Sequence, residues 1–423
     1  MGVIRALDYL SFIFFKKKYF KLTCFMRLLP LFIILFPFFS CNNGNAVLSK
    51  KINAHIAEIQ KKYVPDKRLA LFNVNIDSPN NSAIVLTGET IIPEAKKELL
   101  DLLKKENIQF KDNIEVLPSA ELESKNFGVV NLSVCNIRSK GKHSAELGTQ
   151  AMMGTPLRVY KKEGSFYFIQ TPDNYLGWVD AGGLELMNQK EYNDWLKAEK
   201  TICTADYSFA YKMPDENSEK VTDLIAGNIL KTIGAKNNFT EIALPDGRSG
   251  FVKSGDIMPY KTWLDSRSLT AENILADAKN MMGRPYLWGG TSGKAMDCSG
   301  FTKTVYFLNG VQLERDASLQ VHTGISIETD TATLKNLLPG DLLFFGKKAT
   351  PEKKERISHV AIYMGDGKII HATGKIKIES LKRGDEDFAE HRLNTFIRAK
   401  RVIGSVGKNG IVALKDSPYY QVN

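Results

Sequence analysis

Two stretches in the middle of the chain repeat one pattern of short strands and turns, and this repeat constrains the fold more than any other feature. Residues 167–184 read YFIQTPDNYLGWVDAGGL, and residues 240–257 read TEIALPDGRSGFVKSGDI. Each stretch has a strand, a Pro-Asp turn, a second strand with Gly-aromatic-Val, and a further glycine. Short strands separated by such turns are typical of small barrels. We therefore predict two small all-β barrels of one architecture, at residues 126–190 and 198–262.

A chain of 423 residues is too long for one compact domain, so further units are expected on both sides of the repeats. Residues 42–125 combine helical spacing over 47–63 with two strand-like runs, an amphipathic helix over 94–107 and another strand. This predicts a small α+β unit, to which the sequence assigns no chemistry. After the repeats, residues 265–405 predict a second α+β unit, and residues 406–423 are expected to form a C-terminal tail.

The first 41 residues are expected to be an export signal. Basic residues precede LLPLFIILFPFFSC, an apolar run that is too short, and too interrupted by Pro30 and Pro37, to span a membrane comfortably. Translation could start at Met1 or at Met26. The run ends at Cys41 and resembles a bacterial lipoprotein signal, which implies a lipidated Cys41 and an exported cell-envelope protein. A plain secretory signal with a chance cysteine is the alternative.

Charge and cysteine usage narrow the function. The formal net charge is +10, but six basic residues fall within residues 1–41, and both signs of charge mix along the rest of the chain. This distribution argues against nucleic-acid binding. The sequence lacks CxxC and His/Cys ligand spacing, and its glycine clusters lack phosphate-loop spacing, so no metal, nucleotide or flavin is expected. Cys135 and Cys203 lie in apolar runs and are expected to be buried.

Cys298 differs from these cysteines in its neighbours. It lies in the sequence DCSGF, where Asp297 can cap a helix whose apolar residues recur at helical spacing. In the first turn of a helix, unpaired N–H groups and the helix dipole stabilise a thiolate. His359 and His371 lie on the two arms of a predicted hairpin with a Gly-Asp-Gly turn. An imidazole that accepts the thiol proton, and a third group that orients it, are what a cysteine nucleophile requires.

Three segments carry a family resemblance. YLWGGTSGKAMDCSGF, LPGDLLFF and ISHVAIYMGDGKIIHATG, all within residues 265–400, resemble the NlpC-type papain-like cysteine endopeptidases of peptidoglycan. The repeats resemble the tandem bacterial SH3-like domains that accompany cell-wall enzymes. The resemblance implies an α+β papain-like domain, with Cys298 as nucleophile, His359 as general base and acid, and His371 as the orienting residue. Backbone N–H groups near Cys298 would receive the oxyanion.

A finer resemblance concerns the substrate. HSAELGTQAMMGTPLRV and TPDNYLGW, together with the two SH3-like domains, resemble the γ-D-glutamyl-L-diamino acid endopeptidases of the dipeptidyl-peptidase VI type. This implies murein peptides as substrates, cleaved after γ-D-Glu and bearing a free N-terminal L-Ala. The substrate-binding residues implied are Glu146, Tyr175, Asp297, Ser299 and Ser318, and Trp288 is expected to line the cleft. A carboxylate suits the ammonium of such a peptide, and hydroxyl groups suit its carboxylate.

Other functions stay open at this point. The chain could be a wall-binding lipoprotein whose SH3-like domains act alone, or an amidase or acyltransferase of the same fold. The intact Cys298, His359 and His371 favour the peptidase. The sequence does not decide between meso-diaminopimelate and lysine as the diamino acid, and a monomer is expected.

Overall fold

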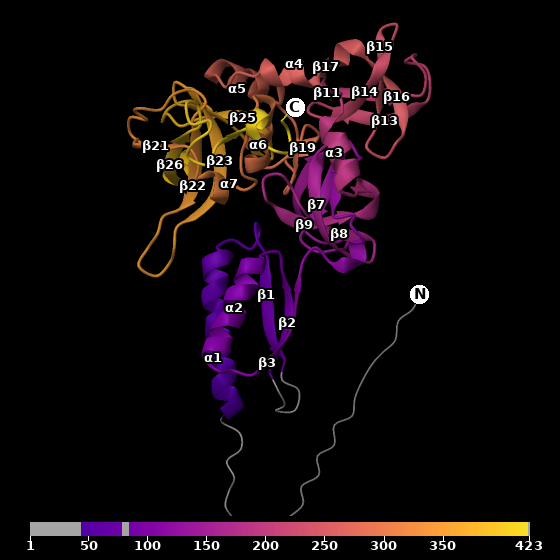
Figure 1. The fold of residues 1–423 in the computed structure, drawn as a ribbon. Coiled ribbons are helices and arrows are strands. Elements are labelled where there is room, and N and C mark those ends of the chain that lie inside the picture. Colours follow the sequence, from indigo (N-terminus) through magenta and orange to yellow (C-terminus); the bar gives the residue numbers. More distant parts are fainter. Residues whose placement is uncertain (1–43, 78–83, 422–423) are drawn as a thin grey trace, which may run out of the picture. The chain divides into compact units, whose positions relative to one another are not determined.

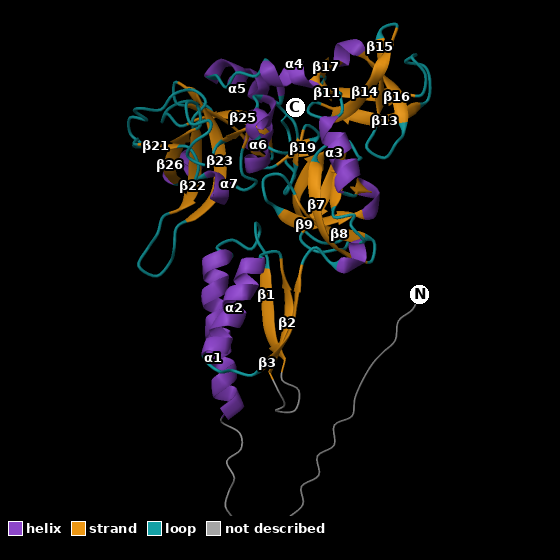
Figure 2. Ribbon diagram, in the orientation of Figure 1, coloured by secondary structure: helices purple, strands orange, loops and turns teal. Residues whose placement is uncertain are grey.

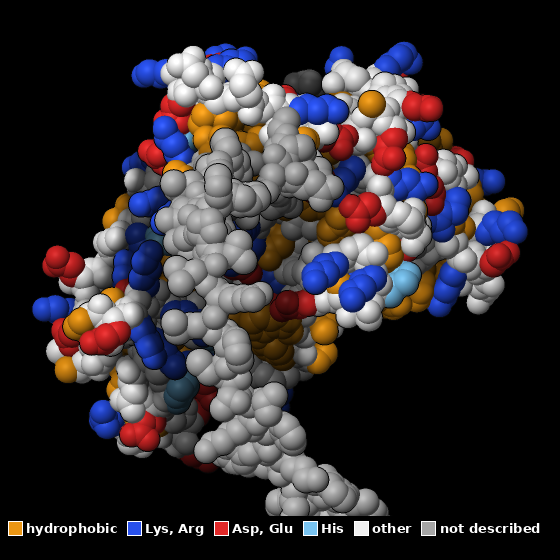
Figure 3. All heavy atoms as spheres, turned by 90° about the horizontal axis from the view of Figure 1, so that it is seen from below, with side chains coloured by type: hydrophobic (Ala, Val, Ile, Leu, Met, Phe, Trp, Pro, Cys, Tyr) orange, Lys and Arg blue, Asp and Glu red, His pale blue; other side chains and the backbone are white. Residues whose placement is uncertain are grey.

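The computed structural model describes residues 44–77 and 84–421 (Figure 1). The expected export signal and Cys41 lie outside the described residues. Within the described part of the chain, no helix is both long enough and apolar enough to cross a membrane. On the face shown in Figure 3, Lys and Arg side chains are interspersed with Asp and Glu side chains.

The N-terminal unit is an α+β layer of two helices on three strands (Figure 2). Its elements are α1 (Gly44–Tyr63), β1 (Phe72–Asp77), β2 (Ile84–Thr90), α2 (Pro93–Lys105) and β3 (Phe110–Val116). β2 pairs antiparallel with β1 and parallel with β3, and α2 forms the crossover. Ala95, Leu99 and Leu103 recur every fourth residue and are fully buried against the sheet, which explains the amphipathic pattern of α2.

The first repeat forms an all-β unit of seven strands. They are β4 (Phe127–Val130), β5 (Val134–Arg138), β6 (Leu147–Met152), β7 (Pro156–Glu163), β8 (Phe166–Gln170), β9 (Leu176–Asp180) and β10 (Leu184–Met187). The strand order is β10-β4-β7-β8-β9-β5-β6. A short helix, α3 (Gln189–Lys197), follows, and Asn188 and Glu191 form a capping box at its start.

The second repeat has the same topology, strand for strand. Its strands are β11 (Lys200–Cys203), β12 (Tyr207–Tyr211), β13 (Lys220–Ile225), β14 (Ile229–Lys236), β15 (Phe239–Ala243), β16 (Ser249–Lys253) and β17 (Ile257–Pro259). Their order, β13-β12-β16-β15-β14-β11-β17, is that of the first unit read from the other edge. The predicted repeat of two small all-β units is confirmed. In both described units the sheet stays open, since no pairing joins its first and last strands.

The last unit places helices on a six-stranded sheet, as predicted. Its helices are α4 (Tyr260–Asp265), α5 (Ala271–Asn280), α6 (Cys298–Leu308), α7 (Ala317–Gln320) and α8 (Glu390–Asn394). The sheet has the order β21-β26-β22-β23-β24-β25, with β21 (Ile325–Ile327), β22 (Leu342–Lys347), β23 (Arg356–Gly365), β24 (Lys368–Thr373), β25 (Lys375–Ser380) and β26 (Phe396–Arg401). Phe301 and Val305 of α6 are fully buried against this sheet.

Two short pairings complete the last unit. β18 (Thr291–Ser292) pairs with β19 (Ala295–Met296) just before α6. β20 (Val311–Gln312), just after α6, pairs with β27 (Val412–Ala413). The segment expected as a tail is therefore packed in its described part. Leu414 and Tyr420 are buried, and the Tyr260 hydroxyl donates to the Tyr420 carbonyl at 2.9 Å.

Candidate active site

Cys298 is the first residue of α6 and lies against the sheet. The Asp297 carboxylate caps the helix by accepting the Gly300 N–H at 2.7 Å, as the sequence predicted. Only 7% of Cys298 is exposed, and its thiol accepts a hydrogen bond from the backbone N–H of Val360 on β23. Because Val360 follows His359, this contact brings the thiol to the strand that carries the predicted base.

Burial dominates the electrostatics of the thiol. It raises the pKa of Cys298 to about 11, and the neighbouring Asp297 charge acts in the same direction. The Val360 N–H, the Arg315 guanidinium and the Ser299 N–H lower the pKa but do not overcome burial. The helix terminus was expected to stabilise a thiolate. In the unliganded protein the thiol stays protonated instead, so a base has to remove its proton during the reaction.

His359 and His371 meet across the hairpin formed by β23 and β24. His359 Nε2 lies 2.7 Å from His371 Nδ1, and both imidazoles are buried. Glu379 on β25 is the third member of this row of hydrogen-bonded side chains, because one of its carboxylate oxygens lies 2.7 Å from His371 Nε2. The sequence analysis did not identify Glu379. Its strand alternates Lys375, Lys377 and Glu379 on one face, but only the pairing of β25 with β24 shows that this face meets His371.

The carboxylate at the end of this row determines where the protons lie. Glu379 accepts a hydrogen bond, so His371 carries its proton on Nε2 and its Nδ1 is an acceptor. That acceptor requires the proton of His359 on Nε2. His359 Nδ1 is then the basic nitrogen that is free to take the proton of the thiol.

Both histidines are held neutral. Burial lowers the pKa of His359 well below its ordinary value, and the positive charge of Arg392 adds to this effect. Burial also lowers the pKa of His371 to about 4, although Glu379 opposes the shift. Burial works against ionisation of Glu379, but its hydrogen bond with Lys377 and the nearby His371 lower its pKa overall. A neutral imidazole is the form that can act as a general base.

Replacing Glu379 by glutamine is expected to lower kcat about fivefold with little change in KM. The substitution keeps a side chain of the same shape that can still accept a hydrogen bond, but it removes the negative charge that stabilises the protonated His359–His371 pair. Steady-state kinetics measure this effect. Glu352→Gln, an exposed position in the loop between β22 and β23, is the matched control and should match the wild type. An unchanged kcat in Glu379→Gln would show that the charge of Glu379 does not contribute to catalysis.

The pH dependence of thiol alkylation tests the protonation state of Cys298. Only the thiolate reacts, and below the pKa each pH unit raises the thiolate fraction about tenfold. With a pKa of about 11, the rate of iodoacetamide modification of the unliganded protein should rise from pH 7 to pH 9 without a plateau. Cys298→Ala gives the background from the other four cysteines of the chain. A plateau that begins below pH 7 would indicate a resting thiolate–imidazolium pair.

Glu146 and Trp288 are brought together, although they are far apart in the chain. The indole Nε1–H of Trp288 donates to Glu146 Oε1 at 2.8 Å, and 63% of Trp288 is exposed. The adjacent residues are also in close contact, because a Cβ on Gly289 would lie 2.2 Å from the Leu147 carbonyl oxygen. A carboxylate of the first SH3-like unit therefore lies beside the segment that leads to Cys298.

Asp297 and Ser299 flank Cys298 and bind a buried arginine. The two guanidinium nitrogens of Arg315 lie 3.2 and 2.7 Å from the Asp297 carboxylate oxygens, and one of them lies 3.0 Å from Ser299 Oγ. Gly289 N–H also donates to Asp297 at 3.0 Å. The Asp297 carboxylate is thus occupied by donors of the chain itself. Its predicted role as a substrate ligand stays a prediction, and its observed role is to fix the position of α6.

Tyr175 and Ser318 lie beside this network. The side chain of Tyr175 is buried, and burial together with the hydrogen-bonded Asp316 raises its pKa. β6 passes next to it, since a Cβ on Gly148 would lie 3.4 Å from the Tyr175 ring. Ser318 lies in α7, close to Asp316, and accepts a hydrogen bond from Arg68 of the N-terminal unit at 3.1 Å. The six predicted binding residues are therefore linked by contacts around the start of α6.

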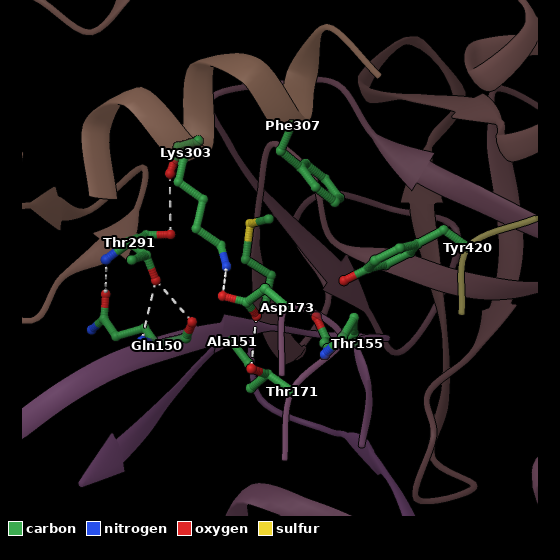
Figure 4. Close-up of a pocket in the computed structure, with 12 residues that line it drawn as sticks. Gln150, Ala151, Thr155, Thr171, Asp173, Thr291, Lys303, Phe307 and Tyr420 are labelled. Atoms are coloured by element: carbon green, nitrogen blue, oxygen red, sulfur yellow. Dashed lines mark hydrogen bonds and ion pairs between the residues drawn. The ribbon is translucent and has the colours of Figure 1, made fainter. Parts of the chain in front are cut away.

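Figure 4 shows a pocket between the first SH3-like unit and α6. Its volume is about 50 Å³, too small for a peptide, and Cys298 is not among its lining residues. Thr291 and Gln150 exchange hydrogen bonds across it, and Lys303 of α6 forms an ion pair with Asp173. We interpret these contacts as the interactions that hold β6, and the neighbouring Glu146, against the last unit.

The two remaining cysteines of the described chain are buried as predicted. Burial raises the pKa of both Cys135 and Cys203 to about 12, so neither is a candidate nucleophile. A helix that presents Cys298 to an antiparallel sheet with two buried histidines is the arrangement of a papain-like cysteine peptidase.

Comparisons with known proteins agree with this class. Residues 283–395 match the NlpC/P60 family, and residues 137–184 match the bacterial dipeptidyl-peptidase SH3 domain. A Bacillus subtilis protein named γ-D-glutamyl-L-lysine dipeptidyl-peptidase is 30% identical over 237 residues, which are 54% of this chain and 73% of that protein. The chain therefore belongs to the NlpC/P60 family and is a cysteine peptidase.

Other similar proteins cover similar shares of the chain. A Bacillus cereus protein with the same name is 29% identical over 54% of this chain and 67% of its own length. Dipeptidyl-peptidase 6 of Lysinibacillus sphaericus is 25% identical over 60% of this chain and 91% of its own length. The crystal structure of an NlpC/P60 family protein from Bacillus cereus has a TM-score of 0.55 at 22% identity, over 65% of this chain and 99% of that one. The structural likeness supports the α+β papain-like fold with SH3-like units.

Proposed function

We propose that this protein hydrolyses the γ-D-Glu–diamino acid bond of peptidoglycan-derived peptides that carry a free N-terminal L-Ala. The observation that carries the proposal is the proximity of two features. One is the hydrogen-bonded set of His359, His371 and Glu379, which begins on β23 beside Val360, the residue whose N–H contacts the Cys298 thiol. The other is the Glu146 carboxylate beside Trp288, in the segment that leads to Cys298. The first feature can cleave an amide, and the second can bind the ammonium group of a short peptide.

In the first half of the reaction, the proton of the Cys298 thiol passes to His359 Nδ1. The sulfur attacks the γ-carbonyl carbon of D-Glu, a C–S bond forms, and the carbonyl electrons move to oxygen. Backbone N–H groups near Cys298 stabilise this oxyanion. His371 and Glu379 stabilise the positive charge that develops on His359.

In the second half, the tetrahedral intermediate collapses and the C–N bond breaks. The departing amino group of the diamino acid takes the proton from His359, and a thioester remains on Cys298. A water molecule, deprotonated by His359, attacks the thioester carbon. The C–S bond breaks, L-Ala-γ-D-Glu leaves, and the sulfur recovers its proton.

Glu146, Tyr175 and Trp288 are proposed to bind the L-Ala end of the peptide, and Ser299 and Ser318 are proposed to bind the α-carboxylate of D-Glu. Asp297 orients Ser299 directly and through Arg315, and it caps α6. The names of the Bacillus relatives, which refer to γ-D-glutamyl-L-lysine, support this substrate class. They leave both lysine and diaminopimelate as candidates for the residue after the cleaved bond.

Incubation with L-Ala-γ-D-Glu-diaminopimelate, L-Ala-γ-D-Glu-L-Lys and their N-acetylated forms tests the proposal. Mass spectrometry of the products should detect L-Ala-γ-D-Glu from the free-amine peptides only. Cleavage at another bond would indicate an amidase of the same fold. Binding to peptidoglycan without any cleavage would indicate a wall-binding protein.

We further propose that the mature protein is exported and anchored through a lipid on Cys41, because a short apolar run ends at this cysteine. Cys41→Ala should move the protein from the membrane fraction to the soluble fraction of the cell envelope. A wild-type protein that incorporates no radiolabelled fatty acid would contradict the anchor.

A further inference from the structure

The N-terminal unit lies outside the segments that match the two families, yet one of its loops contacts the region around the proposed substrate site. The matched segments begin at residue 137, and the unit consists of residues 44–122. The loop between α1 and β1 accepts a hydrogen bond from Leu176 N–H on the Arg68 carbonyl, at 2.7 Å. Leu71 packs in the same apolar cluster as Leu176. This loop is therefore fixed next to Tyr175.

Arg68 of this loop joins it to the last unit. Its Nη1 lies 2.5 Å from Asp316 Oδ2 and 3.1 Å from Ser318 Oγ. Its Nε and Nη2 lie 2.9 and 2.5 Å from the two carboxylate oxygens of Asp66. One planar guanidinium thus holds a loop carboxylate on one side and the start of α7 on the other. A lysine could not make this set of contacts, because its ammonium is a single point of contact.

The partners of Arg68 belong to the same group of side chains as the proposed amine-binding residues. Asp316 follows Arg315, which binds Asp297, and Asp316 also hydrogen-bonds Tyr175. Within the group, the carboxylates of Asp66, Asp297, Asp316 and Glu146 outnumber the guanidinium groups of Arg68 and Arg315. An excess of carboxylates suits a cationic ligand group such as an ammonium.

We propose that the N-terminal unit is a substrate-selecting element, in which Arg68 positions Asp316 and Ser318 and its loop forms a wall at the free-amine end of the site. This inference rests on the proposed function, because it assumes a peptide with a free N-terminal amine. Arg68 is a positioning residue: it acts through Asp316 and Ser318 and does not touch the reacting atoms. The unit would then favour short peptides over peptides whose first nitrogen is acylated.

Kinetics with a free-amine peptide and its N-acetylated form test this role. The Arg68→Ala variant should raise KM for L-Ala-γ-D-Glu-diamino acid about fivefold, leave kcat within about twofold, and lower the preference for the free amine by a similar factor. The KM of Arg68→Lys should fall between those of the wild type and Arg68→Ala, because lysine keeps the positive charge but cannot contact Asp66 and Asp316 at the same time. Lys97→Ala removes an exposed ion pair with Asp101 in the same unit and should match the wild type.

The ratio of kcat/KM between the two peptides separates selection from simple domain attachment. If Arg68 only ties the units together, Arg68→Ala should lower the melting temperature and reduce kcat/KM equally for both peptides, which would overturn the inference. A wild type that cleaves neither peptide would overturn the proposed function as well. A wild type that prefers the free amine, with an unchanged preference in Arg68→Ala, would overturn this inference alone.

Discussion

Replacing Cys298 by alanine is expected to reduce kcat by at least about 10⁴-fold, because no other described group can form the covalent intermediate. Cys135 and Cys203 are buried in the two SH3-like units, away from the histidines. The fold should survive, because removal of one sulfur from the start of α6 leaves only a small cavity, costing about 1 kcal/mol of the free energy of unfolding. Peptide turnover and the melting temperature measure the two effects separately.

His359→Ala should be nearly as severe, and the double variant should be no worse than Cys298→Ala. The two side chains act as one unit, since the thiol is protonated at rest and needs the imidazole to remove its proton. If the kcat losses of the two single variants multiply in the double variant, the two residues act independently of each other. Full turnover by Cys298→Ala would contradict cysteine-peptidase chemistry at this site.

Much of the fold could be predicted because its signals are local. The Pro-Asp turns and the Gly-aromatic-Val strands indicate short strands wherever they occur, and the two SH3-like units share the strand order that their repeat implied. The hairpin around Asp366 follows in the same way from a turn between alternating strands. The cap of α6 could be predicted from Asp297 and from the helical spacing of the apolar residues that follow it.

The parts that could not be predicted depend on contacts between distant segments. Glu379 reaches His371 only because β25 pairs with β24, and a one-residue change of register would turn it away. Arg68 lies about 250 residues from Ser318 in the chain. The raised pKa of Cys298 is a consequence of burial, which a first-turn position does not reveal. Residues 406–421 carry no regular period, yet they fill the space beside β20 and α4.

Replacing Glu146 by alanine is expected to lower kcat/KM for free-amine peptides about 10- to 30-fold. A charge-assisted hydrogen bond contributes roughly 1.5–3 kcal/mol when it is shielded from water. Glu146 is exposed in the unliganded protein, so solvent screening reduces this value towards about 1.5–2 kcal/mol. The effect on an N-acetylated peptide should be much smaller, because that peptide has no ammonium group that could pair with Glu146. The preference for the free amine should therefore fall by nearly the same factor.

A second substitution at this position separates charge from shape. Glu146→Gln keeps an oxygen that can accept the Trp288 indole N–H, so the local geometry is retained while the negative charge is removed. If the charge selects the substrate, Glu146→Gln should lose most of the preference that Glu146→Ala loses. Glu163→Gln, an exposed carboxylate of the same SH3-like unit, should match the wild type, and iodoacetamide should modify Cys298 at the same rate in all three variants. A preference that survives in Glu146→Gln would mean that steric exclusion around Trp288, and not pairing with an ammonium, rejects acylated peptides.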